Sequence, residues 1–367
     1  MRVAVDGTPL LGHRTGIGRY TEHLLSALAG RSDVSVSATA FTVRGAGALS
    51  SSVPPGVRSR SLPVPARLLR AAWTYLEVPT VGLFSGRCDV FHATNFVLPP
   101  TGRAGGVVTI HDLTYLRMPE TVDTTSRALR ELVPRSLARA AVVCTPSRSV
   151  ADQVLDAYGP AVPEIVVTSL GVEPSWLSVD QPGPAERSRL GLPADYFLFV
   201  GTREPRKDLA TLLAGYARMR SEWAAAMEPP TLLLVGPQGW GTDQRPAAGV
   251  RIHDYAPIDD LQRIVAGARA LVMPSRDEGF GLPALEGLAT GIPVIVSDVP
   301  ALLEVTGGHA AVFARGDKDA LAAELTAAAQ PASDDPGAPA RRRAYASGWS
   351  WTRCADATVL AYRHAAG

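Results

Sequence analysis

The chain has 367 residues, of which 46% are hydrophobic, and its 36 Lys and Arg residues nearly balance its 35 Asp and Glu residues. This length exceeds the usual size of one hydrophobic core, so we expect two domains. The balanced charge argues against nucleic acid as a partner. The three cysteines are odd in number and widely spaced, which fits reduced thiols in a cytosol better than disulfides or a zinc site: Cys88, Cys144 and Cys354.

The start of the chain, Met1–Asp6, runs directly into a strand-like segment without the long apolar stretch of a signal peptide. No run of about 18 apolar residues predicts a membrane-spanning helix, and we expect a cytoplasmic protein. Residues 65–84 leave a peripheral contact with the inner face of the membrane open. Apolar residues recur there at helical spacing beside Arg67 and Arg70, although such a stripe more often faces a core: Leu68, Leu69, Ala72, Trp73 and Leu76.

Short apolar and β-branched runs alternate with helical patterns along the chain, which is typical of parallel sheets built from βαβ units. The predicted strands of a first sheet are Val3–Asp6, Val34–Phe41, Val90–Ala93, Val107–His111, Ala141–Thr145 and Ile165–Thr168. Those of a second sheet are Tyr196–Val200, Thr231–Val235, Val250–His253, Ala270–Met273 and Pro293–Val296. The pattern predicts two doubly wound α/β domains of Rossmann type, which bind ligands at the carboxyl ends of their strands.

The domain boundaries follow from composition. We expect an N-terminal domain over residues 1–172 and a linker rich in Pro, Gly and Ser over residues 173–193. A second domain over residues 194–348 then precedes a terminal helix over residues 349–367. Because Asp317-Lys318-Asp319 precedes an alanine-rich helical pattern, we interpret it as a helix cap rather than a metal motif.

A glycine turn follows the first predicted strand. Gly16 and Gly18 precede an amphipathic helix, and such a turn lets the backbone come close to a phosphate. The pattern also raises a dinucleotide-binding alternative. The third glycine of G-x-G-x-x-G is replaced by Thr21, however, and no acid is convincingly placed at the end of a second strand.

Polar residues also stand at the ends of two other strands of the first sheet. His111 and Asp112 end the strand that begins at Val107, which places a titratable pair at the rim of the expected ligand site. A lone histidine in this position is more often structural than catalytic. Asn95 follows the neighbouring predicted strand and is a candidate ligand for a sugar hydroxyl.

The strongest local signal follows the strand Ala270–Met273. A glycine-containing loop leads to Pro283, which suits the first turn of a helix, and the unpaired N–H groups of such a helix attract a diphosphate. Glu286 lies one turn into that helix, where its carboxylate could accept hydrogen bonds from two vicinal sugar hydroxyls. Glu278 lies on the loop before it and could bind another hydroxylated ring. Alternatively, both acids only complement the helix dipole.

This segment resembles the E-x7-E element of family 4 retaining glycosyltransferases, which have the GT-B fold of two Rossmann-like domains facing across a cleft. Glu278 and Glu286 occupy its acidic positions, and the resemblance extends from Val3 to Tyr362. It implies transfer of a sugar from a nucleotide diphosphate donor. Glu286 then binds the donor ribose, and Glu278 contacts the transferred sugar. The residues between them complete the donor site: Gly279, Phe280, Gly281 and Leu282.

The resemblance also assigns the cations of the donor site. Lys207 matches the lysine that neutralises the donor diphosphate. Thr202 stands where many family members have arginine, so a second positive charge must come from Arg206 or Arg203, of which we favour Arg206. Gly236 and Tyr255 lie near the expected nucleotide, without indicating its base.

On the N-terminal side, the resemblance implies that Gly16, Gly18 and Arg19 reach the donor. His111 then contacts the transferred sugar or orients the acceptor, with Asn95 and Asp112 as further candidates. The helix opened by Trp349-Ser350-Trp351 resembles the terminal helix that crosses back to the first domain. Neither a metal nor another cofactor is expected, since the nucleotide sugar is a substrate.

The segments Arg14–Tyr20 and Glu278–Gly281 are similar to those of bacterial mannosyltransferases of polysaccharide assembly. We therefore predict transfer of a hexose, mannose from GDP-mannose, to a sugar, an oligosaccharide or a lipid-linked glycan. The alternatives are a GT-B relative with other chemistry (a phosphorylase, a nucleotide-sugar epimerase or a pseudo-glycosyltransferase) and a catalytically silent binding protein.

Overall fold

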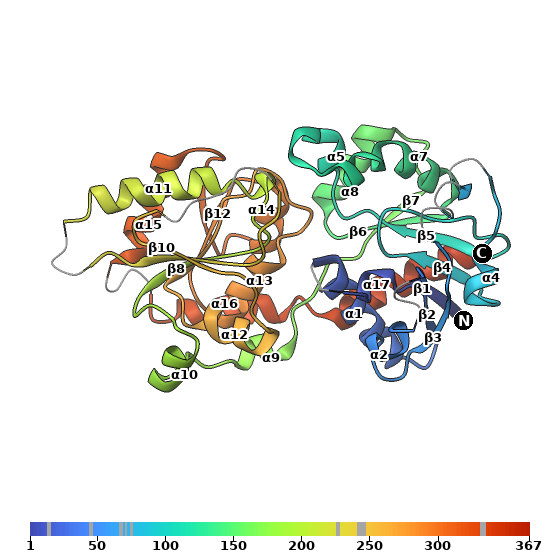
Figure 1. The fold of residues 1–367 in the computed structure, drawn as a ribbon, viewed down its shortest axis with the longest axis horizontal. Coiled ribbons are helices and arrows are strands. Elements are labelled where there is room, and N and C mark those ends of the chain that lie inside the picture. The colour runs from blue at the N-terminus through green and yellow to red at the C-terminus, as the bar shows by residue number, and fades with distance from the viewer. Residues whose placement is uncertain are drawn as a thin grey trace. The chain divides into compact units, whose positions relative to one another are not determined.

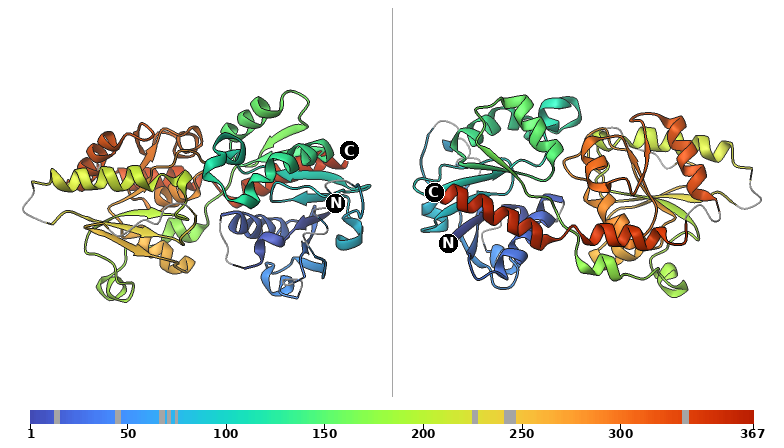
Figure 2. Two further views of the ribbon diagram at one scale, coloured as in Figure 1. Left: turned by 45° about the horizontal axis from the view of Figure 1, so that its top comes forward. Right: turned by 180° about the vertical axis from the view of Figure 1, so that it is seen from behind.

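The computed structural model describes residues 1–367 except 13–15, 44–46, 66–68, 70–71, 74–75, 225–227, 241–246 and 331–334. The chain divides into two compact units, each a parallel sheet surrounded by helices (Figure 1; Figure 2 gives two further views). Unit 1 contains Met1–Arg117, Thr124–Gly171 and Ser350–Gly367. Unit 2 contains Met118–Asp123 and Val172–Trp349.

Unit 1 has a seven-stranded sheet in the order β3-β2-β1-β4-β5-β6-β7, and all neighbouring pairs are parallel. Its strands are β1 (Arg2–Asp6), β2 (Ser35–Phe41), β3 (Arg58–Leu62), β4 (Val90–Ala93), β5 (Gly105–Thr109), β6 (Val142–Thr145) and β7 (Glu164–Val167). Its helices are η1 (Thr8–Leu10), α1 (Gly16–Ala29), α2 (Leu49–Ser52), α4 (Gly82–Ser85), α5 (Thr114–Arg117), α6 (Thr124–Arg127), α7 (Leu129–Arg139), α8 (Arg148–Tyr158) and α17 (Trp351–Ala366).

Unit 2 has a six-stranded parallel sheet in the order β10-β9-β8-β11-β12-β13. Its strands are β8 (Tyr196–Val200), β9 (Thr231–Val235), β10 (Val250–His253), β11 (Ala270–Met273), β12 (Val294–Ser297) and β13 (Ala311–Phe313). Its helices are η2 (Pro119–Thr121), α9 (Pro174–Ser178), α10 (Pro184–Arg189), η3 (Pro205–Lys207), α11 (Leu209–Ser221), α12 (Ile258–Ala266), α13 (Leu282–Thr290), α14 (Pro300–Thr306), α15 (Lys318–Ala329) and α16 (Ala338–Ser347).

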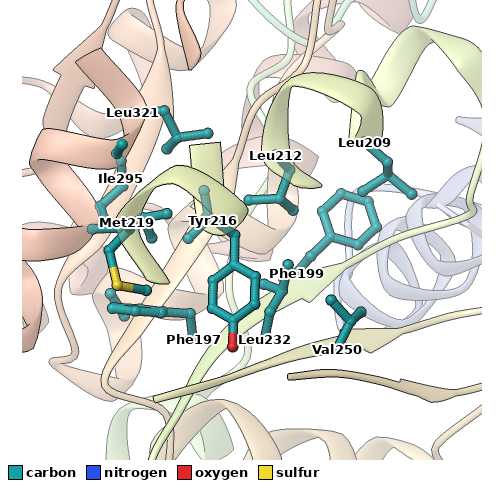
Figure 3. Packing of buried hydrophobic residues seen from close by; sticks show 14 of the residues in the cluster. Phe197, Phe199, Leu209, Leu212, Tyr216, Met219, Leu232, Val250, Ile295 and Leu321 are labelled. Atoms are coloured by element: carbon teal, nitrogen blue, oxygen red, sulfur yellow. The ribbon is translucent and has the colours of Figure 1, made fainter. Parts of the chain in front are cut away.

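The core of unit 2 explains why β8 is almost entirely apolar. All five of its residues are buried, because helices cover both faces of an interior parallel strand. Figure 3 shows Phe197 and Phe199 of this strand packed with Leu212 and Tyr216 of α11, and Leu321 of α15 completes the contact. This packing fixes the strand end from which the loop of Lys207 begins.

The predicted strands are confirmed, and those of β4, β8, β9, β10 and β11 have the predicted bounds. Two strands were not predicted. The strand β3 is an edge strand with exposed Arg58 and Arg60, and β13 has only three residues at the other sheet's edge. Edge strands need no continuous apolar pattern, because one side of the ladder has no neighbour to cover it.

The segment 173–193, which we expected to link two domains, folds as part of unit 2. It contains α9 and α10, and each begins with a proline in its first turn, Pro174 and Pro184. Trp176 is fully buried, and Ser175 accepts a hydrogen bond from Gln262 of α12 (2.7 Å). The prolines that suggested a linker instead start two short helices.

The chain passes from one unit to the other between Gly171 and Val172, and returns between Trp349 and Ser350. The two crossings are neighbours, since the Val172 N–H donates to the Trp349 carbonyl (3.0 Å). A Cβ on Gly171 would overlap the backbone of Ser350 and Trp351. After the second crossing, α17 packs on unit 1, where it contacts α1 and the strands β4 to β7.

The apolar stripe of residues 65–84 is partly described. Leu69 and Trp73 are buried in unit 1, and the Trp73 ring lies 5.1 Å from that of Phe41. Arg67, Leu68 and Arg70 lie outside the described residues. The two buried residues face the core, and membrane contact stays a prediction. Within the described part of the chain, no helix combines the length and the apolar character needed to cross a membrane.

Candidate active site

The sheet of unit 2 has a switch point between β8 and β11, where the order of its strands reverses. Ligands of open parallel sheets bind outside the carboxyl ends of the strands at such a point. Two loops leave the sheet there, residues 201–208 after β8 and residues 274–281 after β11. They carry most of the residues that the sequence predicted for a donor site.

The two loops meet in a buried cluster of charges around Glu278. The Lys207 Nζ donates to Glu278 Oε1 (2.5 Å), and Arg206 Nη1 donates to Glu278 Oε2 (3.0 Å). The Ser275 hydroxyl donates to Oε1 as well (2.7 Å). Burial alone would raise the pKa of Glu278, but the charges of Lys207 and Arg206 lower it to about 2. The carboxylate is therefore ionised throughout the neutral range.

The structure separates the two candidate arginines. Arg206 faces Glu278, and its Nη1 also donates to the carbonyl of Asp277 (3.0 Å). Arg203 instead donates to the carbonyl of Gly236 (3.0 Å) and to Asp254 (3.2 Å). Arg206 and Lys207 are thus brought together with Glu278, and Arg203 is not.

Gly281 turns the second loop into α13. It is the residue before the helix and adopts a left-handed conformation with φ of 94° and ψ of 46°. A Cβ there would lie 2.5 Å from Leu302 Cδ2. Leu282 and Pro283 form the first turn, in agreement with the predicted role of the proline. The helix therefore begins directly behind the charge cluster, where its N–H groups can attract an anion.

The remaining residues of this segment are buried. Glu286 is 1% exposed and lies one turn inside α13, and Gly279 is buried in the loop. Phe280, predicted to bind the donor, is 5% exposed, and its ring lies edge-on to Trp349 with the centroids 5.6 Å apart. Phe280 thus anchors the loop on the segment that precedes α17.

Gly236 and Tyr255 follow β9 and β10 at the same edge of the sheet. Gly236 lies so close to Gly201 that a Cβ would overlap the Gly201 carbonyl. Tyr255 is 55% exposed, and the neighbouring Asp254 side chain is 80% exposed. An exposed aromatic ring therefore lies along this edge beside an exposed carboxylate that is paired with Arg203.

In unit 1, His111 lies at the carboxyl edge of the sheet, beyond the end of β5. It is 9% exposed, and the rings of Tyr20 and Phe96 lie edge-on to it at 5.1 and 5.5 Å. Its Nε2 lies 2.7 Å from the Thr94 carbonyl, which only accepts, so Nε2 carries the proton. Burial lowers the pKa of His111 against the opposing effects of Thr94 and Asp112. The ring is therefore neutral at pH 7, with Nδ1 as a hydrogen-bond acceptor.

The loop after β4 is strained beside this histidine. Phe96 has a φ of 59°, a left-handed conformation that is rare for a bulky residue. Its ring is buried against His111, while the preceding Asn95 is exposed. Asp112 accepts a hydrogen bond from the Thr114 backbone N–H (3.0 Å), so its side chain stabilises the start of α5.

The glycine turn of unit 1 is described from Gly16 onward, and Arg14 and Thr15 lie outside the described residues. Gly16 is exposed at the start of α1, Gly18 is buried and Arg19 is half-buried. The same helix carries Tyr20, whose ring lies against His111. Both the glycine turn and His111 therefore lie in unit 1, and Tyr20 of α1 connects them.

His92, in the strand β4, is a core residue. Its Nδ1 is 2.8 Å from the Tyr362 hydroxyl, and its Nε2 is 2.7 Å from Thr109 Oγ1. Burial lowers its pKa to about 3, helped by His111. Both nitrogens have partners inside unit 1, so His92 joins α17 to the sheet.

Two residues of the charge cluster were not predicted. Ser275 bonds to Glu278, and Glu204 bonds to Arg206 through Nη2 (2.7 Å) and Nε (3.1 Å). An available signal was the sequence Glu204-Pro205-Arg206-Lys207, which places an acid beside two cations in a chain with only one other lysine. Nothing about Ser275 distinguishes it in the sequence.

The D-x-D sequence is a helix cap, as predicted. Asp317 precedes α15 and accepts hydrogen bonds from the backbone of Asp319 and Ala320 (both 2.9 Å). Asp319 pairs with Arg218 (2.7 Å). Among the residues that the structure describes, no cluster of three His, Cys, Asp or Glu side chains could hold a metal ion.

Two parallel-sheet units with a charged switch point are features of glycosyltransferases of the GT-B class. A family model described as "Glycosyl transferase 4-like domain" matches residues 15–171, and one described as "Glycosyl transferases group 1" matches residues 194–330. O-antigen chain mannosyltransferase B of Escherichia coli is 32% identical over 289 residues, 75% of this chain and 74% of that protein. D-inositol 3-phosphate glycosyltransferase of Streptosporangium roseum is 32% identical over 308 residues, 75% and 70% of the two chains.

The solved structure of Anabaena HepE in complex with UDP-glucose has the same fold, with a TM-score of 0.69, 15% identity and 98% of each chain covered. The chain belongs to the group 1, or family 4, glycosyltransferases with the GT-B fold. The predicted family and fold class are confirmed.

Proposed function

We propose that this glycosyltransferase transfers mannose from GDP-mannose to a hydroxyl of a sugar or glycan, with retention of anomeric configuration and without a metal. The observation that carries the proposal is the buried contact of Lys207 and Arg206 with Glu278 at the switch point, in front of α13. The mannose part rests on the similarity to the E. coli O-antigen mannosyltransferase.

In this proposal Lys207 and the N-terminus of α13 neutralise the donor diphosphate, and Arg206 is the second cation of the site. Glu286 binds the ribose, and Glu278 binds a hydroxyl of the transferred sugar. In unit 1, Gly16 and Gly18 present backbone N–H groups to the donor. Backbone donors and fixed charges of this kind stabilise the diphosphate as it leaves, without any reorganisation during the reaction.

The chemistry we propose is a same-face substitution. The bond from the anomeric carbon to the diphosphate breaks, the bond to the acceptor oxygen forms on the same face, and the acceptor proton passes to the departing diphosphate. Glu278 is a poor nucleophile here, because three donors already bond to its oxygens and its pKa is about 2. Its contacts suit a residue that positions the sugar rather than attacks it.

His111 fits a role in sugar binding. With Nε2 protonated and bonded to Thr94, the neutral ring offers Nδ1 as an acceptor for a sugar hydroxyl. Such a ring cannot give up a proton at neutral pH without losing its bond to Thr94. We therefore propose that His111 orients the sugar and is not the acid of the reaction.

The edge of the sheet after β10 supports guanine as the base. The exposed carboxylate of Asp254 accepts from Arg203 through Oδ1, and its two oxygens retain acceptor capacity that matches the adjacent N–H and NH2 donors of guanine. Tyr255 beside it is exposed and offers a ring for stacking. Uracil has only one N–H donor, so it would bond to only one of the two Asp254 oxygens.

The acceptor includes lipid-linked glycans in this proposal, and exposed apolar side chains of unit 1 support a peripheral membrane contact. Leu76, Val78 and Leu83 are 56%, 58% and 59% exposed. Sedimentation with anionic vesicles tests the membrane contact separately. A protein that stays in the supernatant contradicts this contact.

The function is tested first by thermal shift with GDP-, UDP-, TDP- and ADP-sugars, and then by transfer assays with NMR of the anomeric product. We expect stabilisation by GDP-mannose and an α-linked product in the presence of EDTA. A preference for another base contradicts the mannosyl assignment. An isomerised nucleotide sugar without acceptor product identifies an epimerase, and no stabilisation by any nucleotide favours the silent binding protein.

The lysine content offers a sharp test of the site. Lys207 and Lys318 are the only lysines, and Lys207 is 8% exposed whereas Lys318 is exposed on α15. Acetylation followed by mass spectrometry should show that GDP protects Lys207 and leaves Lys318 unchanged. Equal modification of Lys207 with and without GDP would contradict its placement at the diphosphate.

A further inference from the structure

Glu204 has a position in the charge cluster that the proposed function does not use. It directly precedes η3, and its side chain is 8% exposed. One oxygen, Oε1, accepts hydrogen bonds from both Nε (3.1 Å) and Nη2 (2.7 Å) of Arg206. A buried acid thus holds one edge of the guanidinium.

The other edge of Arg206 points to the loop after β11. Its Nη1 bonds to the Asp277 carbonyl and to Glu278 Oε2 (both 3.0 Å), and its own carbonyl accepts from the Arg276 N–H (2.9 Å). The planar guanidinium has a fixed geometry, so fixing its Nε edge also fixes Nη1. Glu204 therefore determines where Arg206 can hold Glu278.

Glu204 also changes the charge that a phosphate meets. Arg206 and Lys207 together with Glu278 carry a net charge of +1, and Glu204 brings the four groups to zero. In a buried site such a charge acts strongly on a nearby anion, because little water screens it. Removing one negative charge should therefore strengthen the binding of a diphosphate.

We infer that Glu204 is a positioning residue with two tasks: it holds Arg206 against Glu278, and it keeps the phosphate site weak enough for the nucleoside diphosphate product to leave. The inference rests on the proposed function. It adds a residue that acts through Arg206 and touches no substrate. Product release limits the turnover of many enzymes, so a site that binds its product too tightly turns over slowly.

Two variants separate the two tasks. Glu204→Gln keeps an oxygen for both bonds to Arg206 and removes the charge. We expect GDP to bind roughly three- to tenfold more tightly, with a steeper dependence on salt. Single-turnover transfer should stay near the wild-type rate, while kcat and the KM for donor both fall. Glu204→Asp keeps the charge and withdraws the carboxylate by one methylene, so kcat/KM should fall without tighter GDP binding.

Glu222→Gln is the matched control, because Glu222 pairs with Arg218 on the exposed surface of α11 in the same unit (3.2 Å). It should leave GDP affinity and transfer unchanged. GDP affinity that is unchanged or weaker in a folded Glu204→Gln variant would overturn the charge role, and normal transfer by Glu204→Asp would overturn the positioning role. A wild-type protein that binds no nucleoside diphosphate refutes the proposed function instead, so the two failures are distinguishable.

Discussion

Gly281 allows a decisive test of how α13 is placed. Its φ of 94° is left-handed, and a Cβ would lie 2.5 Å from Leu302 Cδ2. For Gly281→Ala the backbone conformation costs about 1–2 kcal/mol and the overlap adds about 1–3 kcal/mol, about 2–5 kcal/mol in all. For a unit of this size that lowers the unfolding temperature by roughly 4–20 °C. Relief of the overlap should also displace the N-terminus of α13 and weaken GDP binding.

The matched control is Gly291→Ala at the other end of α13. Gly291 is left-handed as well, with a φ of 84°, but its Cβ would meet the flexible Arg343 guanidinium at 2.9 Å. This variant should lose only the ~1–2 kcal/mol of the backbone term and keep its GDP affinity. Scanning calorimetry and calorimetric titration with GDP measure both quantities. Equal destabilisation of the two variants, or unchanged GDP affinity in Gly281→Ala, would refute the reasoning.

Three further predictions concern single residues. The folded-state pKa of Glu278, about 2, is below its ordinary value of 4.5. The ionised carboxylate therefore contributes about 3 kcal/mol to the free energy of unfolding above pH 4.5, and this contribution is lost as the pH falls toward 2. Urea unfolding should show a smaller loss over this pH range in Glu278→Gln than in the wild-type protein. Gly171→Ala should lower the unfolding temperature by several degrees in a thermal melt, because its Cβ would overlap the Trp351 backbone, whereas Gly183→Ala, with open space around it, should not. Lys207→Arg should reduce donor affinity at least tenfold in a binding titration despite the retained charge, because the larger fork does not fit this buried place, and wild-type affinity in that variant would contradict a specific need for lysine.

The interior strands could be predicted because helices cover both of their faces. A strand such as β8 must then be a nearly continuous apolar run, and its bounds can be found where that run ends. The edge strand β3 has no such requirement, and its arginines are exposed. Its pairing with β2 depends on the neighbouring strand rather than on its own residues, so the sequence pattern does not reveal it.

The candidate site also combines features that follow from the local sequence with features that depend on distant residues. Glycine and proline chemistry marked the start of α13, and the family resemblance pointed to Lys207 and Glu278. Glu204 was missed because its task depends on a partner of Arg206 in a loop more than 70 residues further along the chain. The sequence of a short polar loop does not show which of its acidic side chains become buried when a second loop packs against it.

His92 within β4 and His111 beyond β5 make the point most clearly. His92 and His111 both follow apolar residues, and nothing local separates a core histidine from one at the rim. His92 Nδ1 is bonded to the Tyr362 hydroxyl of α17, from a position 270 residues away. His111 keeps Nδ1 for another partner because only its Nε2 is tied to a carbonyl.

The choice of lysine at position 207 also bears on how the site works. The chain has 36 basic residues and only two lysines, yet the cation closest to Glu278 is one of them. An arginine there would spread its charge over a planar fork that binds phosphate through two bonds at once, whereas a lysine is a compact charge with rotatable donors. The Lys207 Nζ can keep its bond to Glu278 and turn another N–H toward a phosphate oxygen. In this buried place a compact ammonium can serve Glu278 and a phosphate oxygen together, which the larger arginine fork does not fit. Together with the charge balance that Glu204 provides, this favours a donor site that stabilises a leaving diphosphate during transfer and then releases it.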